Sequence, residues 1–118
     1  MSLRFSTFKS FSFAFEGIKA ALKNEPNFRI HIGLAILAVI LGVVFKFSFL
    51  ELAILALTIG FVLILELINT TLEAVVNLVS PEIQDQAKIA KDVSAAAVLV
   101  SAILSVIVAF FLFLPKII

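Results

Sequence analysis

VSAAAVLVSAILSVIVAFFLFL, residues 93–114, decides the fold class, because its 22 positions contain no charged residue. A membrane-spanning helix needs about 20 predominantly apolar residues. Inside hydrocarbon, a helix satisfies every backbone hydrogen-bonding group within its own segment. The stretch therefore predicts a transmembrane helix, which we place at residues 88–114 with its polar start included.

Two further segments have the same apolar character. In residues 28–46 the charged residues and a histidine lie near the ends, and in residues 49–79 a long apolar run follows Glu51. Pro26 suits the first turn of a helix, and Ser48-Phe-Leu-Glu51 has the form of a capping box. We expect an all-α integral membrane fold, with transmembrane helices over 28–46, 49–79 and 88–114 in one domain of residues 1–118.

The composition supports a membrane protein. Of 118 residues, 63% are hydrophobic and 14% are charged, whereas soluble domains have about 25% charged residues. The net charge of +1 provides no basic surface for nucleic acid, so we expect no nucleic-acid partner. The absence of cysteine excludes a thiolate metal site and a cysteine nucleophile.

The N-terminal residues 1–23 have helical periodicity with two unlike faces. The apolar face holds Phe8, Phe11, Phe15, Ile18 and Leu22, and the charged face holds Lys9, Glu16, Lys19 and Lys23. Such a pattern is typical of an amphipathic helix lying on a membrane surface. A helix packed against partner subunits has the same pattern and is the alternative.

The basic residues predict the orientation in the membrane. Seven of them flank the expected cytoplasmic ends: Arg4, Lys9, Lys19, Lys23, Arg29, Lys88 and Lys91. Only Lys46 and Lys116 lie on the opposite side. Because basic residues favour the cytoplasmic side, we expect the N-terminus and the connection between the second and third spans to be cytoplasmic.

A polar stripe at the end of the second predicted span is the most informative feature for function. Glu66, Asn69, Glu73 and Asn77 are spaced by 3, 4 and 4 residues, so they lie within an arc of about 80° on one helix face. Glu66 lies about 25 Å along a helix that begins at Phe49, a few ångströms inside the cytoplasmic boundary of a hydrocarbon core roughly 30 Å thick.

An ionisable residue at this depth indicates a functional site, and a glutamate there is suited to act as a general base. Carboxylates and amides on one helix face can also join the subunits of an oligomer by hydrogen bonds, which is the structural alternative. Two carboxylates without cysteine favour a hard cation such as Mg²⁺, bound together with phosphate.

Charged residues of the neighbouring spans are expected at the same membrane level. Glu25 and Arg29 begin the first span, and Lys91 and Asp92 lie near the start of the third. They could bind phosphate, metal or a ribose hydroxyl, or they could be interfacial side chains that reach water. His31 is the only histidine, and we interpret it as an interfacial hydrogen-bonding residue rather than a ligand.

These motifs resemble a known family. They are Asn24-Glu25-x-x-Phe28-Arg29, Glu66-x-x-Asn69-Thr70-x-Leu72-Glu73 and Ala90-Lys91-Asp92, in this order. The chain is similar to the prokaryotic integral-membrane diacylglycerol kinase and undecaprenol kinase family, and more to the undecaprenol kinase branch. It departs from the family pattern at Asn77, where an aspartate is usual.

The resemblance implies a homotrimer in the bacterial plasma membrane that transfers the γ-phosphate of ATP directly to a membrane lipid alcohol. The expected acceptor is undecaprenol, with diacylglycerol as the alternative. The implied catalytic residues are Glu66, the general base, and Asn69, which positions the carboxylate or the hydroxyl. The other implied site residues are Glu25 and Glu73 for Mg²⁺, Lys91 and Asp92 for the phosphate and nucleoside of ATP, and Glu82 and Gln84 near the nucleotide.

The residues by themselves leave two functions outside this class open. The stripe could be a proton or cation relay in a small transporter subunit, although its acidic residues gather at one end of the membrane. It could also be the polar contact of a purely structural assembly protein.

Overall fold

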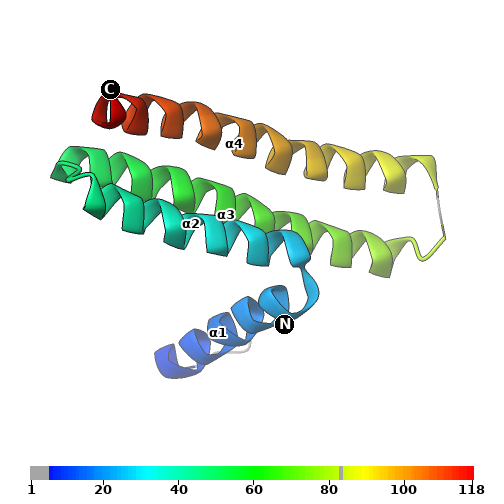
Figure 1. Cartoon of the computed structure of the whole chain (residues 1–118). Helices are drawn as coiled ribbons and strands as arrows, with labels where there is room; N and C mark the ends of the chain where they lie inside the picture. The colour runs from blue at the N-terminus through cyan, green and yellow to red at the C-terminus, as the bar shows by residue number, and fades with distance from the viewer. Residues whose placement is uncertain (1–5, 83) are drawn as a thin grey trace.

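The computed structural model describes residues 6–82 and 84–118, which form four helices. They are α1 (Thr7–Asn24), α2 (Pro26–Val44), α3 (Phe49–Val79) and α4 (Asp85–Ile117), as Figure 1 shows. Arg4, which we counted in the predicted charge asymmetry, and the other residues of the predicted surface helix before Ser6 lie outside the described residues.

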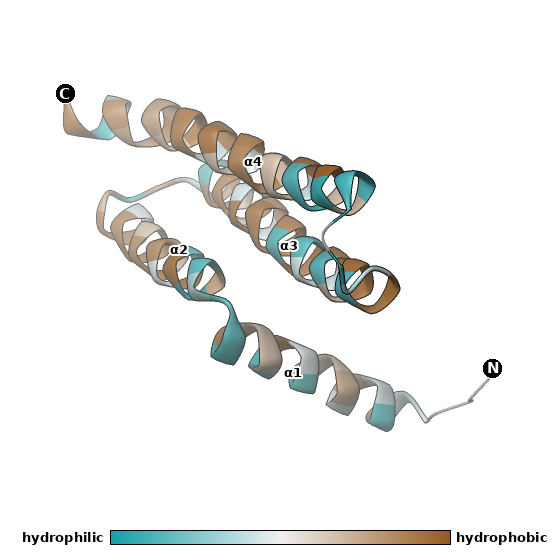
Figure 2. Ribbon diagram, turned by 90° about the vertical axis from the view of Figure 1, so that its right-hand side faces the viewer, coloured by the Kyte–Doolittle hydropathy of each residue, from teal (hydrophilic) through white to brown (hydrophobic). Residues whose placement is uncertain are grey.

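The three long helices α2, α3 and α4 are each long and apolar enough to cross a membrane. This confirms the all-α fold with three potential membrane spans. α3 packs against both α2 and α4, and most residues of these three helices are hydrophobic (Figure 2). Hydrophilic residues are conspicuous where α4 begins and on the facing part of α3, so polar groups gather at one end of the bundle.

The helix ends follow the local signals in the sequence. Pro26 is at the start of α2, where its missing N–H leaves no helical hydrogen bond unmade. Ser48 and Glu51 form both bonds of the predicted capping box, with lengths of 3.2 Å and 3.0 Å. α4 is longer than the predicted segment 88–114 at both ends. At the C-terminal end it continues past Pro115, which is accommodated in the last turn.

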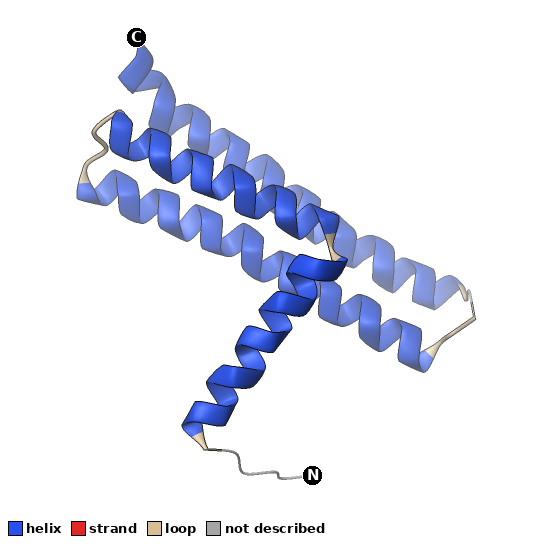
Figure 3. Cartoon of the chain, turned by 60° about the horizontal axis from the view of Figure 1, so that its bottom comes forward, coloured by secondary structure: helices blue, strands red, loops and turns tan. Residues whose placement is uncertain are grey.

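Helix α1 leaves the bundle at an angle and meets it only near its C-terminal end (Figure 3). Ala21 and Phe28 are buried at this junction, with 2% and 3% of their surface exposed. The Arg29 guanidinium donates hydrogen bonds to the carbonyls of Leu22 (2.7 Å) and Lys23 (3.0 Å). Because terminal helix carbonyls lack partners within the helix, Arg29 caps α1 and fixes its direction relative to α2.

At the opposite end of the bundle, aromatic side chains hold the three long helices together. Phe47, Leu55 and Leu112 form the buried core, and the ring of Phe113 packs 4.8 Å from that of Phe47 between centroids. Gly42 of α2 lies against this core, because a Cβ atom there would come within 3.1 Å of the Phe47 ring. A side chain at position 42 would therefore require the Phe47 ring to move by a few tenths of an ångström.

Gly42→Val tests this packing. We expect the variant to lower the free energy of unfolding by about 1–3 kcal/mol, the usual cost of overpacking a core. Gly33→Val in the same helix is the matched control, because nothing lies within 4 Å of a Cβ at that position. Unfolding in detergent micelles, followed by circular dichroism, measures both variants; equal destabilisation would contradict the role of Gly42.

Candidate active site

The polar stripe of α3 lies as the spacing predicted, and its burial decreases along the helix. Glu66 and Asn69 are buried, with 3% and 9% of their surface exposed. Glu73 is half-buried and Asn77 is exposed. The stripe therefore leads from the interior of the bundle to its polar end.

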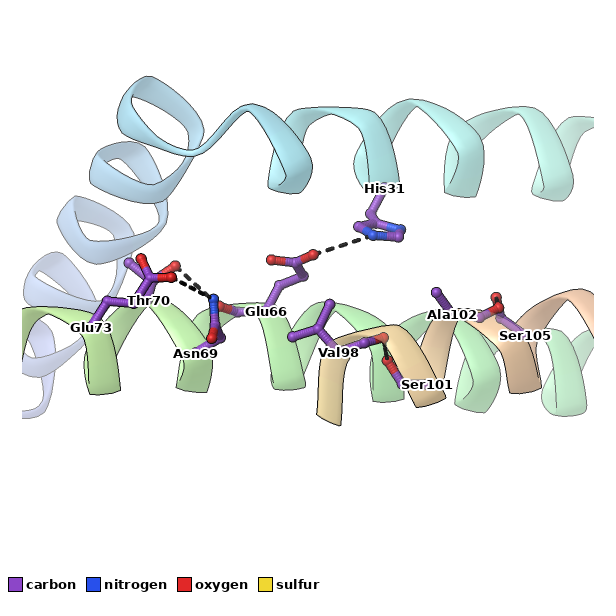
Figure 4. A network of polar contacts seen from close by, with 9 residues as sticks. All are labelled: His31, Glu66, Asn69, Thr70, Glu73, Val98, Ser101, Ala102 and Ser105. Carbon is purple, nitrogen blue, oxygen red and sulfur yellow. Dashed lines mark hydrogen bonds and ion pairs between the residues drawn. The ribbon is translucent and has the colours of Figure 1, made fainter. Parts of the chain in front are cut away.

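Glu66 faces α2, where the side chain nearest to its carboxylate is His31 (Figure 4). The His31 Nε2 atom lies 3.2 Å from Glu66 Oε1, which is an ion-pair distance. The two groups are not aligned as a hydrogen bond, and Oε1 is buried without a hydrogen-bond partner among the described residues. A buried carboxylate oxygen in this state is an acceptor available to a further donor.

Asn69 is held between α4 and its own helix. Ser94 of α4 donates a hydrogen bond of 2.7 Å to the Asn69 side-chain oxygen. The Asn69 amide nitrogen in turn donates to Glu73 Oε1 at 3.3 Å. Ser94 thereby fixes which way the amide points, and the amide restrains the Glu73 carboxylate.

The sequence reasoning missed both Ser94 and the contact of His31. A signal for Ser94 was present, because Ser94, Ser101 and Ser105 recur at a spacing of seven and four residues in an otherwise apolar helix. Small polar residues at such a spacing are typical of a face where two membrane helices approach closely. No comparable signal identifies the partner of His31, since it belongs to another helix 35 positions further along the chain.

The carboxylates of Glu25 and Glu73 are both near enough to Glu66 to act on it electrostatically. Glu25 stands at the junction of α1 and α2, so the acidic groups of this region come from α3 and from that junction. Within residues 6–82 and 84–118, no three His, Cys, Asp or Glu residues are arranged as a metal site by themselves. Mg²⁺ often binds one or two carboxylates and completes its shell with substrate phosphate and water, so Glu25 and Glu73 suit a site that a nucleotide completes.

The other predicted nucleotide residues lie toward the polar end of the bundle. Asp92 is exposed and pairs with Lys88 one turn earlier in α4. Lys91 is half-buried and makes no ion pair with another described residue. Glu82 and Gln84 are exposed between α3 and α4, and in the described part of the chain neither is hydrogen-bonded to the stripe.

An apolar cavity of about 340 Å³ adjoins the Glu66 region. It is lined by side chains of α2, α3 and α4, and it extends from His31 to Phe113 at the far end of the bundle. Apart from His31, Thr58 and Ser105, its lining residues are hydrophobic. A hydrocarbon chain in this cavity would bring its polar end next to His31 and Glu66.

Comparison with known proteins gives one consistent family. The family model described as prokaryotic diacylglycerol kinase matches residues 12–113. An undecaprenol kinase from Bacillus subtilis (strain 168) is 40% identical over 109 residues, which are 92% of this chain and 89% of that protein. A diacylglycerol kinase from Synechocystis sp. is 43% identical over 107 residues, 90% of this chain and 61% of that protein. One from Escherichia coli (strain K12) is 31% identical over 99 residues, 84% and 81% of the two chains.

Ser94→Ala tests the bond between α4 and Asn69. We expect it to lower the free energy of unfolding by about 0.6–2 kcal/mol, the range measured for hydrogen bonds between membrane helices. Ser101→Ala is the matched control, because the Ser101 hydroxyl donates only to Val98 within its own helix. Equal stability of the two variants, measured by unfolding in detergent micelles, would show that the Ser94 bond adds nothing.

Proposed function

This chain belongs to the prokaryotic diacylglycerol kinase family, and from that premise we propose that it transfers the γ-phosphate of ATP to the hydroxyl of undecaprenol. Family membership favours a lipid kinase over the transporter subunit and the assembly protein that the residues alone left open. Diacylglycerol is the second candidate acceptor, because relatives named diacylglycerol kinase also match.

One observation carries the catalytic part of the proposal: the Glu66 carboxylate is buried beside an apolar cavity, and its Oε1 atom has no hydrogen-bond partner in the described chain. A lipid alcohol is complementary to this arrangement, because its hydrocarbon chain would fit the apolar cavity and its hydroxyl could donate a hydrogen bond to the carboxylate. Burying an unpartnered carboxylate costs free energy, which the incoming hydroxyl would partly recover.

In the proposed reaction Glu66 is the general base. Its carboxylate accepts the proton of the lipid hydroxyl as the hydroxyl oxygen attacks the γ-phosphorus of ATP. The bond between the γ-phosphorus and the β–γ bridging oxygen breaks, and ADP leaves with the electron pair of that bond. Most of the catalysis in such a transfer comes from positioning and from neutralising charge, so the restraint of Asn69 by Ser94 is suited to a positioning role.

The remaining residues fit the binding of MgATP. Glu25 and Glu73 would hold Mg²⁺, which when bound neutralises phosphate charge. Lys91, which has no ion-pair partner among the described residues, would bind phosphate as a point charge. We further propose that Asp92 binds the nucleoside and that the exposed Glu82 and Gln84 lie near the bound nucleotide.

We place the protein in the bacterial plasma membrane as a homotrimer, with α1 on the cytoplasmic surface. The large exposure of the apolar face of α1, with Phe8, Phe11 and Phe15 each more than 60% exposed, supports contact with lipid. The homotrimer follows from the family resemblance. The undecaprenol assignment is supported by the Bacillus subtilis relative, which aligns over most of both chains.

A phosphotransfer assay in mixed micelles tests the function. Purified protein with MgATP is offered undecaprenol and diacylglycerol in parallel, and the phosphorylated lipid is quantified. We expect faster turnover on undecaprenol, because the Bacillus subtilis relative that aligns over most of both chains is named undecaprenol kinase. Faster turnover on diacylglycerol would reassign the acceptor, and turnover on neither would overturn the kinase proposal.

The Glu66→Gln variant, in the same assay, tests the role of the general base. It should lower kcat by about 10²–10⁴-fold, the usual contribution of such a group. Glu51→Gln is the matched control, because Glu51 is in the same helix but pairs with Lys116 at the opposite end. Cross-linking checks that the oligomer persists; its loss in Glu66→Gln alone would point to a structural role instead.

Because the chain contains no cysteine, single cysteines can test the orientation. We expect a membrane-impermeant maleimide on intact cells to label Lys46→Cys, in the α2–α3 turn, and not Gln86→Cys, at the start of α4. Both should react after permeabilisation. The reverse pattern on intact cells would place the N-terminus outside.

A further inference from the structure

His31 occupies a position where it can act on Glu66 directly. It lies in α2, little more than a turn after Pro26, and its side chain is 22% exposed. Its Nε2 atom is 3.2 Å from Glu66 Oε1 on α3. Figure 4 shows the imidazole turned from α2 toward this carboxylate.

The imidazole is the one positively chargeable side chain at ion-pair distance from Glu66 in the described chain. The lysines of the described ion pairs are engaged elsewhere, with Asp92 and with Glu51. The Arg29 guanidinium, two residues before His31, is bound to the carbonyls at the end of α1. Among the described residues, His31 is thus the group at ion-pair distance that can compensate Glu66, and burial of a carboxylate without a compensating group is costly.

We propose that His31 is a positioning residue that holds Glu66 in its working orientation. The Nε2 atom faces Oε1 at 3.2 Å and restricts rotation of the carboxylate. Because a carboxylate has about four lone-pair sites, Oε1 can still accept the hydroxyl proton. This inference rests on the proposed function of Glu66 as general base. A base oriented by a third group is a recurring arrangement in enzymes.

The position of His31 in the wall of the apolar cavity supports the same role. A glutamate side chain can rotate about three bonds and is entropically costly to hold still. Without the imidazole, the cavity side of Glu66 would be bounded by hydrocarbon, and the carboxylate could turn toward the polar end of the bundle. His31 keeps the base at the end of the cavity where an acceptor hydroxyl would lie.

Three substitutions separate positioning from bulk packing. The amide nitrogen of Gln stands about as far from the backbone as Nε2 of His, whereas that of Asn falls short and Leu has no donor. We expect His31→Gln to keep kcat within about threefold, and His31→Asn and His31→Leu to lose about 10–100-fold, since a misplacement of 1 Å can cost that much. KM for MgATP and for the lipid should change less than about twofold, because positioning acts on the transition state.

Ser101→Ala is the control, because Ser101 is a buried polar residue that bonds only within α4; it should keep kcat and both KM values. Thermal unfolding of each variant identifies losses caused by misfolding. If His31→Leu does not fold, the kcat of His31→Gln compared with that of His31→Asn still tests the positioning role. A loss in His31→Gln as large as in His31→Asn overturns the role, as does a change in lipid KM with unchanged kcat.

A double-mutant cycle with Glu66→Asp tests whether His31 acts through Glu66. The shorter side chain withdraws the carboxylate from the imidazole, so His31→Leu should cost less in that background than in wild type. Equal costs overturn the proposed coupling. Absence of lipid phosphorylation in wild type overturns the proposed function and this role together, whereas wild-type turnover that His31→Leu retains overturns the role of His31 alone.

Discussion

The Glu66 carboxylate is buried among three apolar helices, and burying a charged group costs free energy unless polar groups compensate it. A carboxylate in a low-dielectric interior must be close to polar groups or lose its charge. For Glu66 the group at ion-pair distance is His31 of α2. Ser94 of α4 bonds to Asn69, the next polar residue of the stripe, and Asn69 donates to Glu73. The packing of α2 and α4 against α3 therefore determines which contacts the site residues make.

The two ends of the bundle meet this requirement in different ways. At one end, the Phe45, Phe47 and Phe113 rings and the Glu51–Lys116 pair hold the helices together by packing and by an ion pair. At the other end, helix α4 approaches α3 through small side chains such as Ser94 and Ser101, both buried. One end of the bundle is thus held by apolar packing, and toward the other lies the buried Glu66 Oε1 atom, which has no hydrogen-bond partner among the described residues.

The attachment of α1 depends on Arg29, a charged residue that the sequence places at the membrane interface and that has a structural role in the fold. Arg29 is near Glu25 and the stripe in sequence terms, and a phosphate-binding role was open to it. In the structure its guanidinium instead caps the carbonyls of Leu22 and Lys23. Because guanidinium groups favour planar acceptors held in a fixed geometry, this contact sets the direction in which α1 leaves the bundle.

The sequence by itself determined the helices, their boundaries to within a few residues, and the polar face of α3. These features depend on local patterns: apolar length, the capping box at Ser48 and Glu51, Pro26, and the spacing from Glu66 to Asn77. Only the tertiary structure decided that His31 faces Glu66 and that Ser94 holds Asn69. Both contacts join different helices, and their formation depends on how each helix is rotated about its axis, which is set by side-chain packing across the whole bundle.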